Sequence, residues 1–435
     1  MSATAPIVII GAGLAGLTAA TYLQRHGRKV RVFEAGKAVA GLARSFQDAD
    51  GFTYDFGAHF ITNRLAAAVG VSAICRHMPR YGESVWQNGR SSSYPFGLMR
   101  QPRFVASAFA KKATSPFRGK PRNAAEWYEN AYGNKLAREI AIPITEAWSG
   151  APAAELAPSV GDKFTSSLPR TMLLHAAARF TGRTVAVGYS SSVPESPHVW
   201  HVYPSGGIGA ICERMADEVK SCISLESPVQ SIHVTDDRVC GVRVADTDID
   251  ASAVITTAPL HVLPKIVKGT NRLDHLARFR YRPMIFVNLR FRGRDLIPNV
   301  VTWTPEKQYP FFRLSEIGTG LPWLVPDGKT LITADIGCQV NDELWQMPDD
   351  ALGEKCIEAL REMIPDAKER YLGCRVLRTP IAYPVYLNEY EAERKAFGES
   401  TGIDGLYSIG RNGEFAHILM EDVYWRTRRK LAMLV

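Results

Sequence analysis

Residues 7–35 read IVIIGAGLAGLTAATYLQRHGRKVRVFEA, and this stretch carries the strongest structural signal in the chain. Residues 7–10 are an unbroken apolar run that leads directly into glycine, as expected of a buried parallel strand that ends in a tight turn. The pattern becomes helical over residues 14–26, and residues 28–35, with two valines and a phenylalanine, supply a second strand. These pieces predict a β-α-β unit at the start of an α/β domain with a parallel sheet.

Three glycines and one acid in this unit point to a dinucleotide. Gly11, Gly13 and Gly16 form G-x-G-x-x-G: the first permits the turn, the second lets the backbone approach a pyrophosphate, and the third lets the helix pack on the strand. Glu34 ends the second strand, where a carboxylate accepts hydrogen bonds from ribose hydroxyls and disfavours a 2′-phosphate, so we do not expect NADP. The residues alone leave NAD and FAD open, and a glycine-rich turn without a ligand is the plainer alternative.

Length and composition are those of a globular protein. At 435 residues the chain is too long for one ordinary core, so we expect two closely joined domains. Hydrophobic residues make up 46% and charged residues 22%, which argues against a mainly disordered chain. The seven cysteines are scattered and form no C-x-x-C pair, so we expect reduced thiols in a cytoplasmic protein and no metal site. No apolar run reaches about 18 residues, so we expect no membrane span.

Basic residues gather where acidic residues are absent. From Ser84 to Ala125 there is no Asp or Glu, while eight positions are Lys or Arg. Such a bias attracts an anionic substrate, an acidic membrane surface or nucleic acid, or it is simply a solvated basic face. No nucleic-acid-binding motif accompanies the charge, so we do not expect a nucleic acid partner. The tail VYWRTRRKLAMLV at 423–435 allows a weak membrane-surface contact, although we expect it to be the last helix of the first domain.

The opening of the chain resembles a known superfamily. Residues 11–46, GAGLAGLTAATYLQRHGRKVRVFEAGKAVAGLARSF, followed by GFTYDFGAHFI at 51–61, are similar to the FAD-binding opening of the flavin amine oxidase, protoporphyrinogen oxidase and UDP-galactopyranose mutase superfamily. The resemblance implies FAD as the cofactor and a Rossmann-like FAD-binding domain. In that superfamily a Gly-Gly pair usually follows near the isoalloxazine and ribityl chain, and here Ala40 takes the place of its first glycine.

Later stretches are similar to the same superfamily in chain order. They are VYPSGGIGAICERMADEV at 202–219, SPVQSIHV at 227–234, DASAVITTAPL at 250–260 and GLYSIGRNGEFAHILMEDVYWRTRRKL at 405–431. The resemblance implies a discontinuous FAD-binding domain of residues 1–85, 203–262 and 399–435. Residues 86–202 and 263–398 would then form an α+β substrate domain, built on a mixed sheet with a helical portion.

The resemblance also implies which residues surround the cofactor. Val229 would contact adenine through its backbone, and the helix that begins near Met420 would favour the negative charge of reduced flavin. The full set that we expect at the cofactor is Gly11, Gly13, Leu14, Ala15, Gly16, Glu34, Ala35, Gly41, Leu42, Ala43, Arg44, Gly57, Ala58, His59, Val229, Thr257, Ala258, Pro259, Gly410, Arg411, Met420 and Glu421.

On the substrate side, His59, Arg313 and Arg411 are the candidate catalytic residues. In the mutase branch the histidine that matches the GAH of residues 57–59 lies at the isoalloxazine, which implies the same for His59; a packed core histidine is the alternative. A guanidinium suits phosphate or carboxylate, although either arginine could instead form a structural ion pair. We expect Trp148, Tyr383 and Tyr386 to line the substrate cavity or to pack in the core.

These features predict an FAD-dependent oxidoreductase, with a biosynthetic role, that takes a hydride from a C–N or C–C bond of a small anionic or lipophilic substrate. A redox-neutral mutase acting on a nucleotide sugar is the alternative, favoured by the basic stretch and by TEAWSG at 145–150. Against it, the paired tyrosines of the mutase motif are replaced at residues 415–418 by FAHI, and residues 337–365 resemble the protoporphyrinogen oxidase branch. A flavin-fold protein without catalysis is a third reading, and the oligomeric state stays open.

Overall fold

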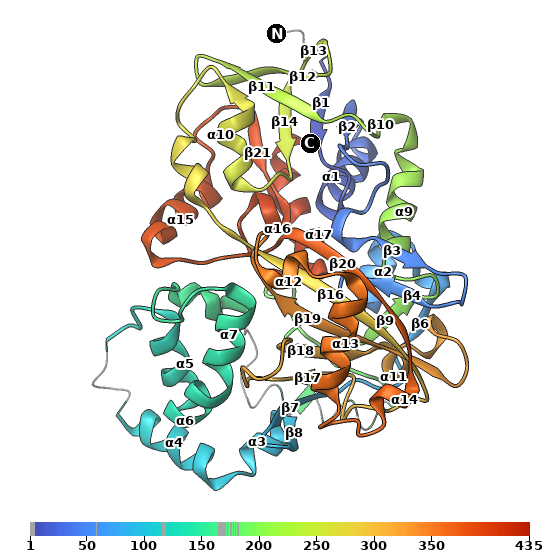
Figure 1. Ribbon diagram of the computed structural model, residues 1–435. Coiled ribbons are helices and arrows are strands. Elements are labelled where there is room, and N and C mark those ends of the chain that lie inside the picture. The colour runs from blue at the N-terminus through green and yellow to red at the C-terminus, as the bar shows by residue number, and fades with distance from the viewer. Residues whose placement is uncertain are drawn as a thin grey trace.

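The computed structural model describes residues 5–57, 59–114, 119–163, 171, 173–174, 176, 178, 180 and 182–435. It is an α/β protein with a parallel sheet and a larger mixed sheet. Figure 1 shows the parallel sheet in the upper part of the molecule, the mixed sheet below it, and a helical lobe at the lower left. The described chain begins directly before β1 of the parallel sheet, and its C-terminus lies beside the same sheet.

The parallel sheet has the strand order β10-β2-β1-β14-β21, and all its neighbouring strands are parallel. Its strands are β1 (Ile7–Ile10), β2 (Val30–Phe33), β10 (Ile223–Ser224), β14 (Ala253–Thr256) and β21 (Leu406–Ser408). Helix α1 (Leu14–Arg25) joins β1 to β2 and packs against α9 (Gly209–Glu218) and α17 (Met420–Leu431). Segments from the start, middle and end of the chain therefore build one sheet.

A four-stranded sheet lies beside the parallel one. Its order is β13-β12-β11-β15, with β11 (Val229–Thr235), β12 (Arg238–Val244), β13 (Thr247–Asp250) and β15 (Val267–Lys268). The chain enters it from β10, leaves it for β14 of the parallel sheet and returns to it for β15. Because β10 pairs in parallel with β2, β11 begins close to the carboxyl end of β2.

The mixed sheet has the order β20-β16-β19-β18-β17-β7-β8, and only its β17–β7 pair is parallel. Its strands are β7 (Glu83–Gln87), β8 (Arg90–Tyr94), β16 (Tyr281–Arg292), β17 (Val301–Trp303), β18 (Arg313–Glu316), β19 (Lys329–Gly337) and β20 (Tyr371–Pro384). Along β16, Ile285, Val287 and Leu289 pack in one core with α13 (Asp349–Leu360), whereas Met284 and Phe286 pack in another core on the opposite face. That opposite face points toward the site described below.

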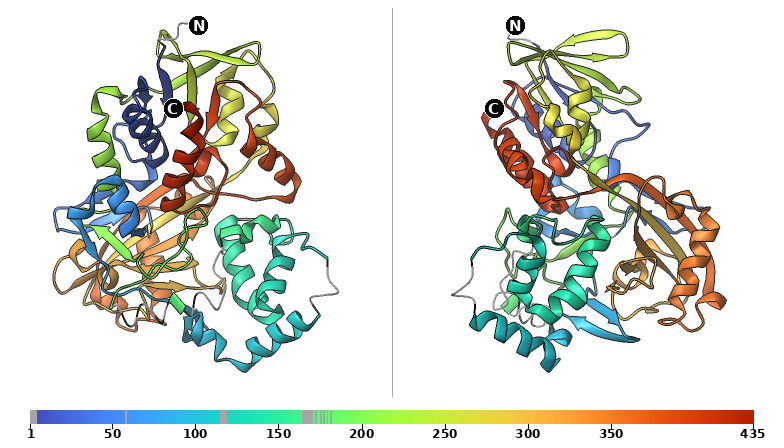
Figure 2. Two further views of the ribbon diagram at one scale, coloured as in Figure 1. Left: turned by 180° about the vertical axis from the view of Figure 1, so that it is seen from behind. Right: turned by 60° about the vertical axis from the view of Figure 1, so that its left-hand side comes forward.

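The helical lobe connects β8 to the rest of the chain. It contains α3 (Phe96–Met99), α4 (Pro102–Ala113), α5 (Ala124–Tyr132), α6 (Asn134–Leu136), a π-helical segment (Ala137–Ala141) and α7 (Ile142–Ser149). Asn123 caps α5 by accepting the Glu126 N–H at 2.9 Å, and Gly150 ends α7 in the left-handed conformation, with φ +72°. Figures 1 and 2 both show α4 at the end of the lobe that lies farthest from the parallel sheet.

Two small sheets hold the loop that carries His59. β3 (Ser45–Gln47) pairs with β4 (Thr53–Asp55), and β9 (His201–Pro204) pairs with both β5 (Ile61–Thr62) and β6 (Cys75–His77). His59 lies between β4 and β5, so its loop is held at both ends by strand pairs.

Most expected elements are present where the sequence places them. Strands β1 and β2 and helix α1 form the predicted β-α-β unit. The apolar segments at 284–291 and 330–337, which the sequence indicates as strands of the mixed sheet, lie in strands β16 and β19. The expected domain boundary at residue 85 falls within β7, a strand of the mixed sheet, so the exact division into domains stays a prediction. The seven cysteines, all within described ranges, are free thiols. Among the helices that the structure describes, none is both long and apolar enough to cross a bilayer.

Candidate functional site

Two glycines of the first turn are needed by the packing of the protein itself. Gly11 has φ +98°, and a Cβ there would lie 2.2 Å from the Thr257 hydroxyl oxygen. A Cβ on Gly16 would lie 1.9 Å from the carbonyl oxygen of Gly11, so only glycine lets α1 pack this closely on the turn.

Gly13 is different, because no neighbouring protein group requires a glycine there. It precedes α1 with φ −78°, an ordinary value for any residue, and among the described residues only the Ala40 carbonyl oxygen comes within 4.0 Å of a Cβ built on it. The space beside the turn is therefore open, while the first N–H groups of α1 have no intrahelical partner. Open space at a helix N-terminus fits a pyrophosphate.

Glu34 is held at the carboxyl end of β2, facing this turn. One carboxylate oxygen accepts the Ala12 N–H at 2.7 Å and the other accepts the Gly36 N–H at 2.8 Å. Each oxygen keeps further lone-pair capacity for a ribose hydroxyl. The Ser227 N–H donates to the Glu34 carbonyl at 2.8 Å, so the chain passes the carboxyl end of β2 two residues before Val229.

The carboxyl ends of β1, β14 and β21 meet at the same edge of the parallel sheet. The Thr257 hydroxyl and N–H both donate to the Ile10 carbonyl, at 2.9 and 3.0 Å. Gly410, with φ +78°, follows β21, and a Cβ on it would lie 2.5 Å from the Ala15 Cβ. Ala258 and Pro259 continue from the same edge. This is the edge where doubly wound α/β sheets bind their ligands.

The second expected cofactor loop lies against the first turn. The Ala40 N–H donates to the Ala12 carbonyl at 2.9 Å, and a Cβ on Gly41 would lie 3.7 Å from the Gly13 Cα. Ala40 is buried and has φ +81°, in the left-handed region that favours glycine. The alanine that replaces the usual glycine therefore carries backbone strain. Leu42 and Ala43 continue this loop as a 3-10 turn, and Arg44 extends over the Phe46 ring at 5.0 Å.

His59 is kept neutral by its surroundings. Burial, together with the positive charges of Arg411 and Arg313, lowers its pKa to about 4. Its Nδ1 atom is buried without a hydrogen-bond partner among the described residues. A neutral imidazole with an unused nitrogen therefore lies within electrostatic reach of two guanidinium groups. Ala58, the neighbouring expected cofactor residue, lies outside the described residues.

Arg313 is paired inside the protein. It begins β18 and lies opposite Asp335 of β19; its Nε donates to Asp335 Oδ2 at 2.9 Å, and Nη2 binds the same oxygen. Burial opposes the cation, but Asp335, assisted by Tyr383 and Glu83, outweighs burial and raises the pKa of Arg313. A Cβ on Gly57 would lie 3.5 Å from Arg313 Nη2, so this ion pair lies beside the His59 loop. Arg313 thus has the structural partner that the sequence left as an alternative.

Arg411 has no such partner. It lies in α16 (Gly410–Gly413), and within the described ranges no carboxylate comes within ion-pair distance of it. Its Nε is buried without a hydrogen bond, and its guanidinium lies 4.8 Å over the Tyr383 ring. Burial lowers the pKa of Arg411, although an arginine stays charged at physiological pH. The site therefore contains a partly buried cation that no carboxylate of the described residues neutralises.

Aromatic rings form a wall next to Arg411. The ring of Trp148, on α7, lies 5.7 Å from Tyr383 and 4.7 Å from His417, and Tyr383 lies 4.7 Å from His417. Tyr386 is less available, because its hydroxyl accepts the His417 N–H at 2.6 Å and its ring lies under Arg394. Trp148 is only 4% exposed, so it both packs in the core and joins this wall.

At the start of α17, backbone groups rather than the Glu421 side chain are available to a cofactor. The carboxylate of Glu421 binds the Thr62 hydroxyl at 2.5 Å, Arg64 Nε at 2.6 Å and Trp425 Nε1 at 3.2 Å. Its side chain is fully committed to these contacts. Any role of Met420 and Glu421 at a cofactor would therefore fall to the N–H groups of the first helical turn.

A family model described as flavin containing amine oxidoreductase matches residues 14–423. The chain belongs to this family. Among solved structures it is similar to reduced UDP-galactopyranose mutase, with 19% identity, a TM-score of 0.77, and coverage of 99% of this chain and 96% of that one. It is also similar to cyclohexylamine oxidase from Brevibacterium oxydans IH-35A, with 16% identity, a TM-score of 0.69, and coverage of 99% of each chain.

A double mutant of putrescine oxidase gives 14% identity and a TM-score of 0.68, covering 99% of this chain and 98% of that one. At these identities the solved structures support the fold alone. A curated relative, the inactive all-trans-retinol 13,14-reductase of Danio rerio, is 42% identical over 55 residues, which are 13% of this chain and 9% of that protein. Within the flavin-containing amine oxidoreductase family, the glycine turn and Glu34 of this chain fit the flavin dinucleotide that the family name implies.

Three residues of this flavoprotein site were not singled out from the sequence. They are Asp335, Trp303 and Glu83: the Trp303 ring lies 5.4 Å from Arg313, and its Nε1 donates to Glu83 at 2.8 Å. Asp335 did carry a signal, since it is the only charged residue in the apolar strand LITADIG of residues 331–337. A lone acid in a buried strand indicates a buried partner.

A cavity of about 400 Å³ lies between α7 and residues 304–312. Its lining includes Ala147 and Phe312, which directly neighbour Trp148 and Arg313 in the chain. Arg282 also lines it, with its guanidinium so close to Gly150 that a Cβ there would lie 2.6 Å away. The cavity therefore adjoins the wall of the site from the side of the helical lobe.

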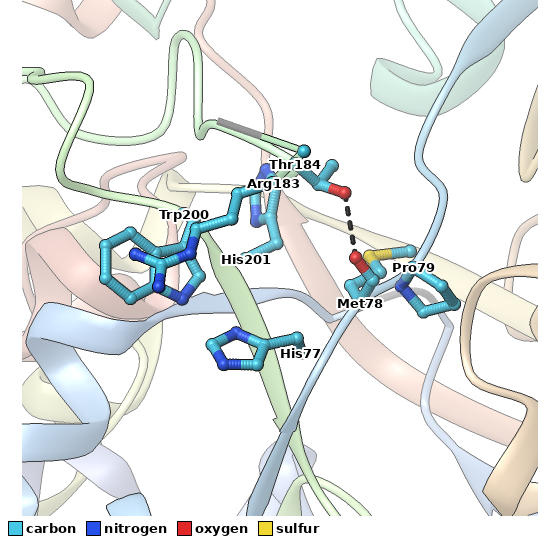
Figure 3. A pocket seen from close by; sticks show the side chains of 8 residues that line it. His77, Met78, Pro79, Arg183, Thr184, Trp200 and His201 are labelled. Carbon is cyan, nitrogen blue, oxygen red and sulfur yellow. Dashed lines mark hydrogen bonds between the residues drawn. The ribbon is translucent and has the colours of Figure 1, made fainter. Parts of the chain in front are cut away.

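A second hollow, of about 280 Å³, lies beside β6 and β9 (Figure 3). In it the Arg183 guanidinium lies 4.0 Å over the Trp200 ring. The ring of Phe60 lies 6.1 Å from that of His201, which lines this hollow. The hollow thus lies near the His59 loop, and the described residues that line it do not include His59, Arg313 or Arg411.

Proposed function

We propose that this protein binds FAD and is an oxidoreductase that takes a hydride from a C–N or C–C bond of a small anionic substrate. One observation carries the proposal: Arg411 is a partly buried cation with a fully buried Nε and no carboxylate partner among the described residues, within electrostatic reach of the neutral His59 and the internally paired Arg313. Substrate anions with a carboxylate or phosphate group match such a site.

The electrostatics argue against a protonated amine. Two unit positive charges 4 Å apart repel by about 4 kcal/mol at an effective dielectric constant of 20. An ammonium group next to Arg411 would meet this repulsion, while an anion would gain a comparable attraction. The family name therefore does not carry over to the substrate of this chain.

Different residues of the chain would hold the cofactor and the substrate. The open turn at Gly13 and the carboxylate of Glu34 would hold the pyrophosphate and ribose of FAD, which supplies the hydride acceptor when bound. Arg411 would bind and orient the substrate anion, and Trp148 and Tyr383 would exclude water from it. His59 would offer its buried Nδ1 as a hydrogen-bond partner.

A redox-neutral mutase is the second candidate, supported by the similarity to UDP-galactopyranose mutase and by the same cation, which also suits a diphosphate. Phe415 weighs against it. In place of a hydroxyl, this position carries a fully buried ring packed against Phe279 and Tyr281.

The test begins with the purified protein, its visible spectrum and the identity of any released flavin. Anaerobic reduction of the flavin is then measured with saturated carboxylates, phosphate esters and amines, and turnover of UDP-galactopyranose is measured in the presence of dithionite.

We expect an anionic compound to reduce the flavin and bleach its visible absorption. Arg411→Gln should weaken the binding of that compound about 100-fold through loss of a charged hydrogen bond. Arg292→Gln, at an exposed position at the end of β16, is the control. If amines reduce the flavin and Arg411→Gln does not change this reduction, the proposed substrate class is refuted. If UDP-galactopyranose is rearranged only when the flavin is reduced, the protein is a mutase instead.

A further inference from the structure

Helix α4 exposes an apolar face to solvent. Its inner side is formed by Phe104, which is buried, and by the half-buried Ser107, Ala108 and Lys111. Solvent-facing helix surfaces are normally polar. Here six of the eight exposed helical positions are apolar: Pro102, Val105, Ala106, Phe109, Ala110 and Ala113.

The most prominent of these side chains are large. Phe109 is 77% exposed and Val105 is 47% exposed, and their spacing of four residues places them side by side on the helix. Met99, at the end of α3, adds a third large apolar side chain that is 40% exposed. We call this surface the α4 face. It consists of Met99, Val105 and Phe109 and of the exposed alanines of α4, which are Ala106, Ala110 and Ala113.

Positive charge surrounds the α4 face. Arg100 and Lys112 are exposed, and neither has an ion-pair partner within the described part of the chain. Arg103 is exposed too, although Glu139 pairs with it at 3.0 Å. The acid-free stretch from Ser84 to Ala125 contributes no Asp or Glu to this surface.

We propose that the α4 face docks the protein on a bilayer that contains anionic phospholipid. A helix with an apolar face and basic flanks is the type that lies in the membrane interface, where lysine and arginine are attracted to anionic headgroups. A second copy of this chain fits poorly, because it would bring Arg100 and Lys112 against the same two cations. Figures 1 and 2 show α4 at the free end of the helical lobe, so a flat surface can approach it without meeting the parallel sheet.

The C-terminal tail is a weaker place for such contact. Lys430 donates to the Ser408 carbonyl at 2.9 Å, and Arg428 lies over the rings of Tyr22 and Trp425 at 5.3 and 5.6 Å. These basic groups are engaged by the protein itself, which leaves Met433, 74% exposed, as the prominent apolar group of the tail.

The test is sedimentation of the full chain with vesicles of phosphatidylcholine, with and without phosphatidylglycerol. We expect the protein to sediment only with vesicles that contain phosphatidylglycerol, and we expect this binding to weaken as the salt concentration rises.

The double variant Val105→Ser with Phe109→Ser should bind these vesicles at least about tenfold more weakly, because it removes the apolar anchor. Met433→Ser and Val340→Ser change exposed apolar residues elsewhere and should bind normally. Replacing Arg100 and Lys112 by Gln should weaken binding, while Arg292→Gln should not.

A second measurement does not depend on the double variant folding. Phe109→Trp should show a blue shift of tryptophan emission with phosphatidylglycerol vesicles and none with phosphatidylcholine alone. The proposal is wrong if wild type fails to sediment, if the Val105/Phe109 variant sediments equally well, or if Met433→Ser is the variant that loses binding. A dimer in solution that the same double variant converts to monomer would show that a second copy covers the face instead.

Discussion

Replacing Gly13 by alanine should separate stability from cofactor binding. An added Cβ would have no described protein atom closer than 4.0 Å, and φ −78° suits any residue. The free energy of unfolding of the flavin-free protein should therefore stay equal or rise by about 0.5 kcal/mol, because alanine restricts the unfolded chain more than glycine does. The same methyl group would occupy the space that we assign to the pyrophosphate. Loss of two charge-assisted hydrogen bonds to the pyrophosphate would weaken the binding free energy of FAD by about 3 kcal/mol, which is roughly 100-fold in affinity.

Two further alanine variants make the comparison decisive. Gly16→Ala would place a Cβ 1.9 Å from the Gly11 carbonyl and should destabilise the flavin-free protein by about 3 kcal/mol. Gly398→Ala, on α15 (Glu391–Glu399) with no atom within 4 Å of its Cβ, should leave flavin binding unchanged. The assays are urea denaturation without flavin and a fluorescence titration with FAD. If Gly13→Ala binds FAD as tightly as wild type, the assignment of the pyrophosphate to this turn is refuted.

Three other outcomes follow from the geometry. Ala40→Gly should raise the free energy of unfolding by up to about 1 kcal/mol, because it relieves the strain at φ +81°. A free energy of unfolding that falls by a similar amount in urea denaturation would contradict this. Because the pKa of His59 is about 4 in the folded protein, below its ordinary value, the unfolded state binds the proton first. His59 should then contribute stability that is lost as pH falls from about 6.5 to 4, and His59→Gln should flatten that part of the stability profile; an unchanged slope would count against a neutral imidazole. Asp335→Asn leaves the mostly buried Arg313 unpaired and should lower the free energy of unfolding by about 3 kcal/mol, whereas Arg313→Met combined with Asp335→Leu should recover most of this loss; equal losses in both variants, measured by urea denaturation, would speak against the ion pair.

The parts of the fold that could be predicted are those set by neighbours in the sequence. Ile7–Ile10 form a buried strand because an apolar run meets a glycine, and α1 begins directly after the turn. The parallel pairing of β7 with β17 is different, since it joins Val301 to Glu83 across more than 200 residues. No local pattern specifies that register; it results from how the two faces of the mixed sheet pack.

The site was predictable only in part for the same reason. His59, Arg313 and Arg411 came from resemblance to a family, and they do lie close enough for the two arginines to lower the pKa of the histidine. The commitment of the Glu421 carboxylate to Thr62 and Arg64 could not be read from the sequence, because the three residues meet only when α17 packs against α2 (Asn63–Val69) and β5.

The two arginines show why the substrate class needed the structure. In the sequence they are equal candidates for an anion, since each guanidinium has the same charge and geometry. The β18–β19 register places Asp335 directly opposite Arg313, and that carboxylate neutralises Arg313, whereas Arg411 has no carboxylate partner among the described residues. A residue that touches no ligand in this proposal therefore determines which cation is available to the substrate. If Asp335 is replaced by Asn, Arg313 becomes a second unneutralised cation, and an anionic substrate should bind in an altered position even where the fold survives.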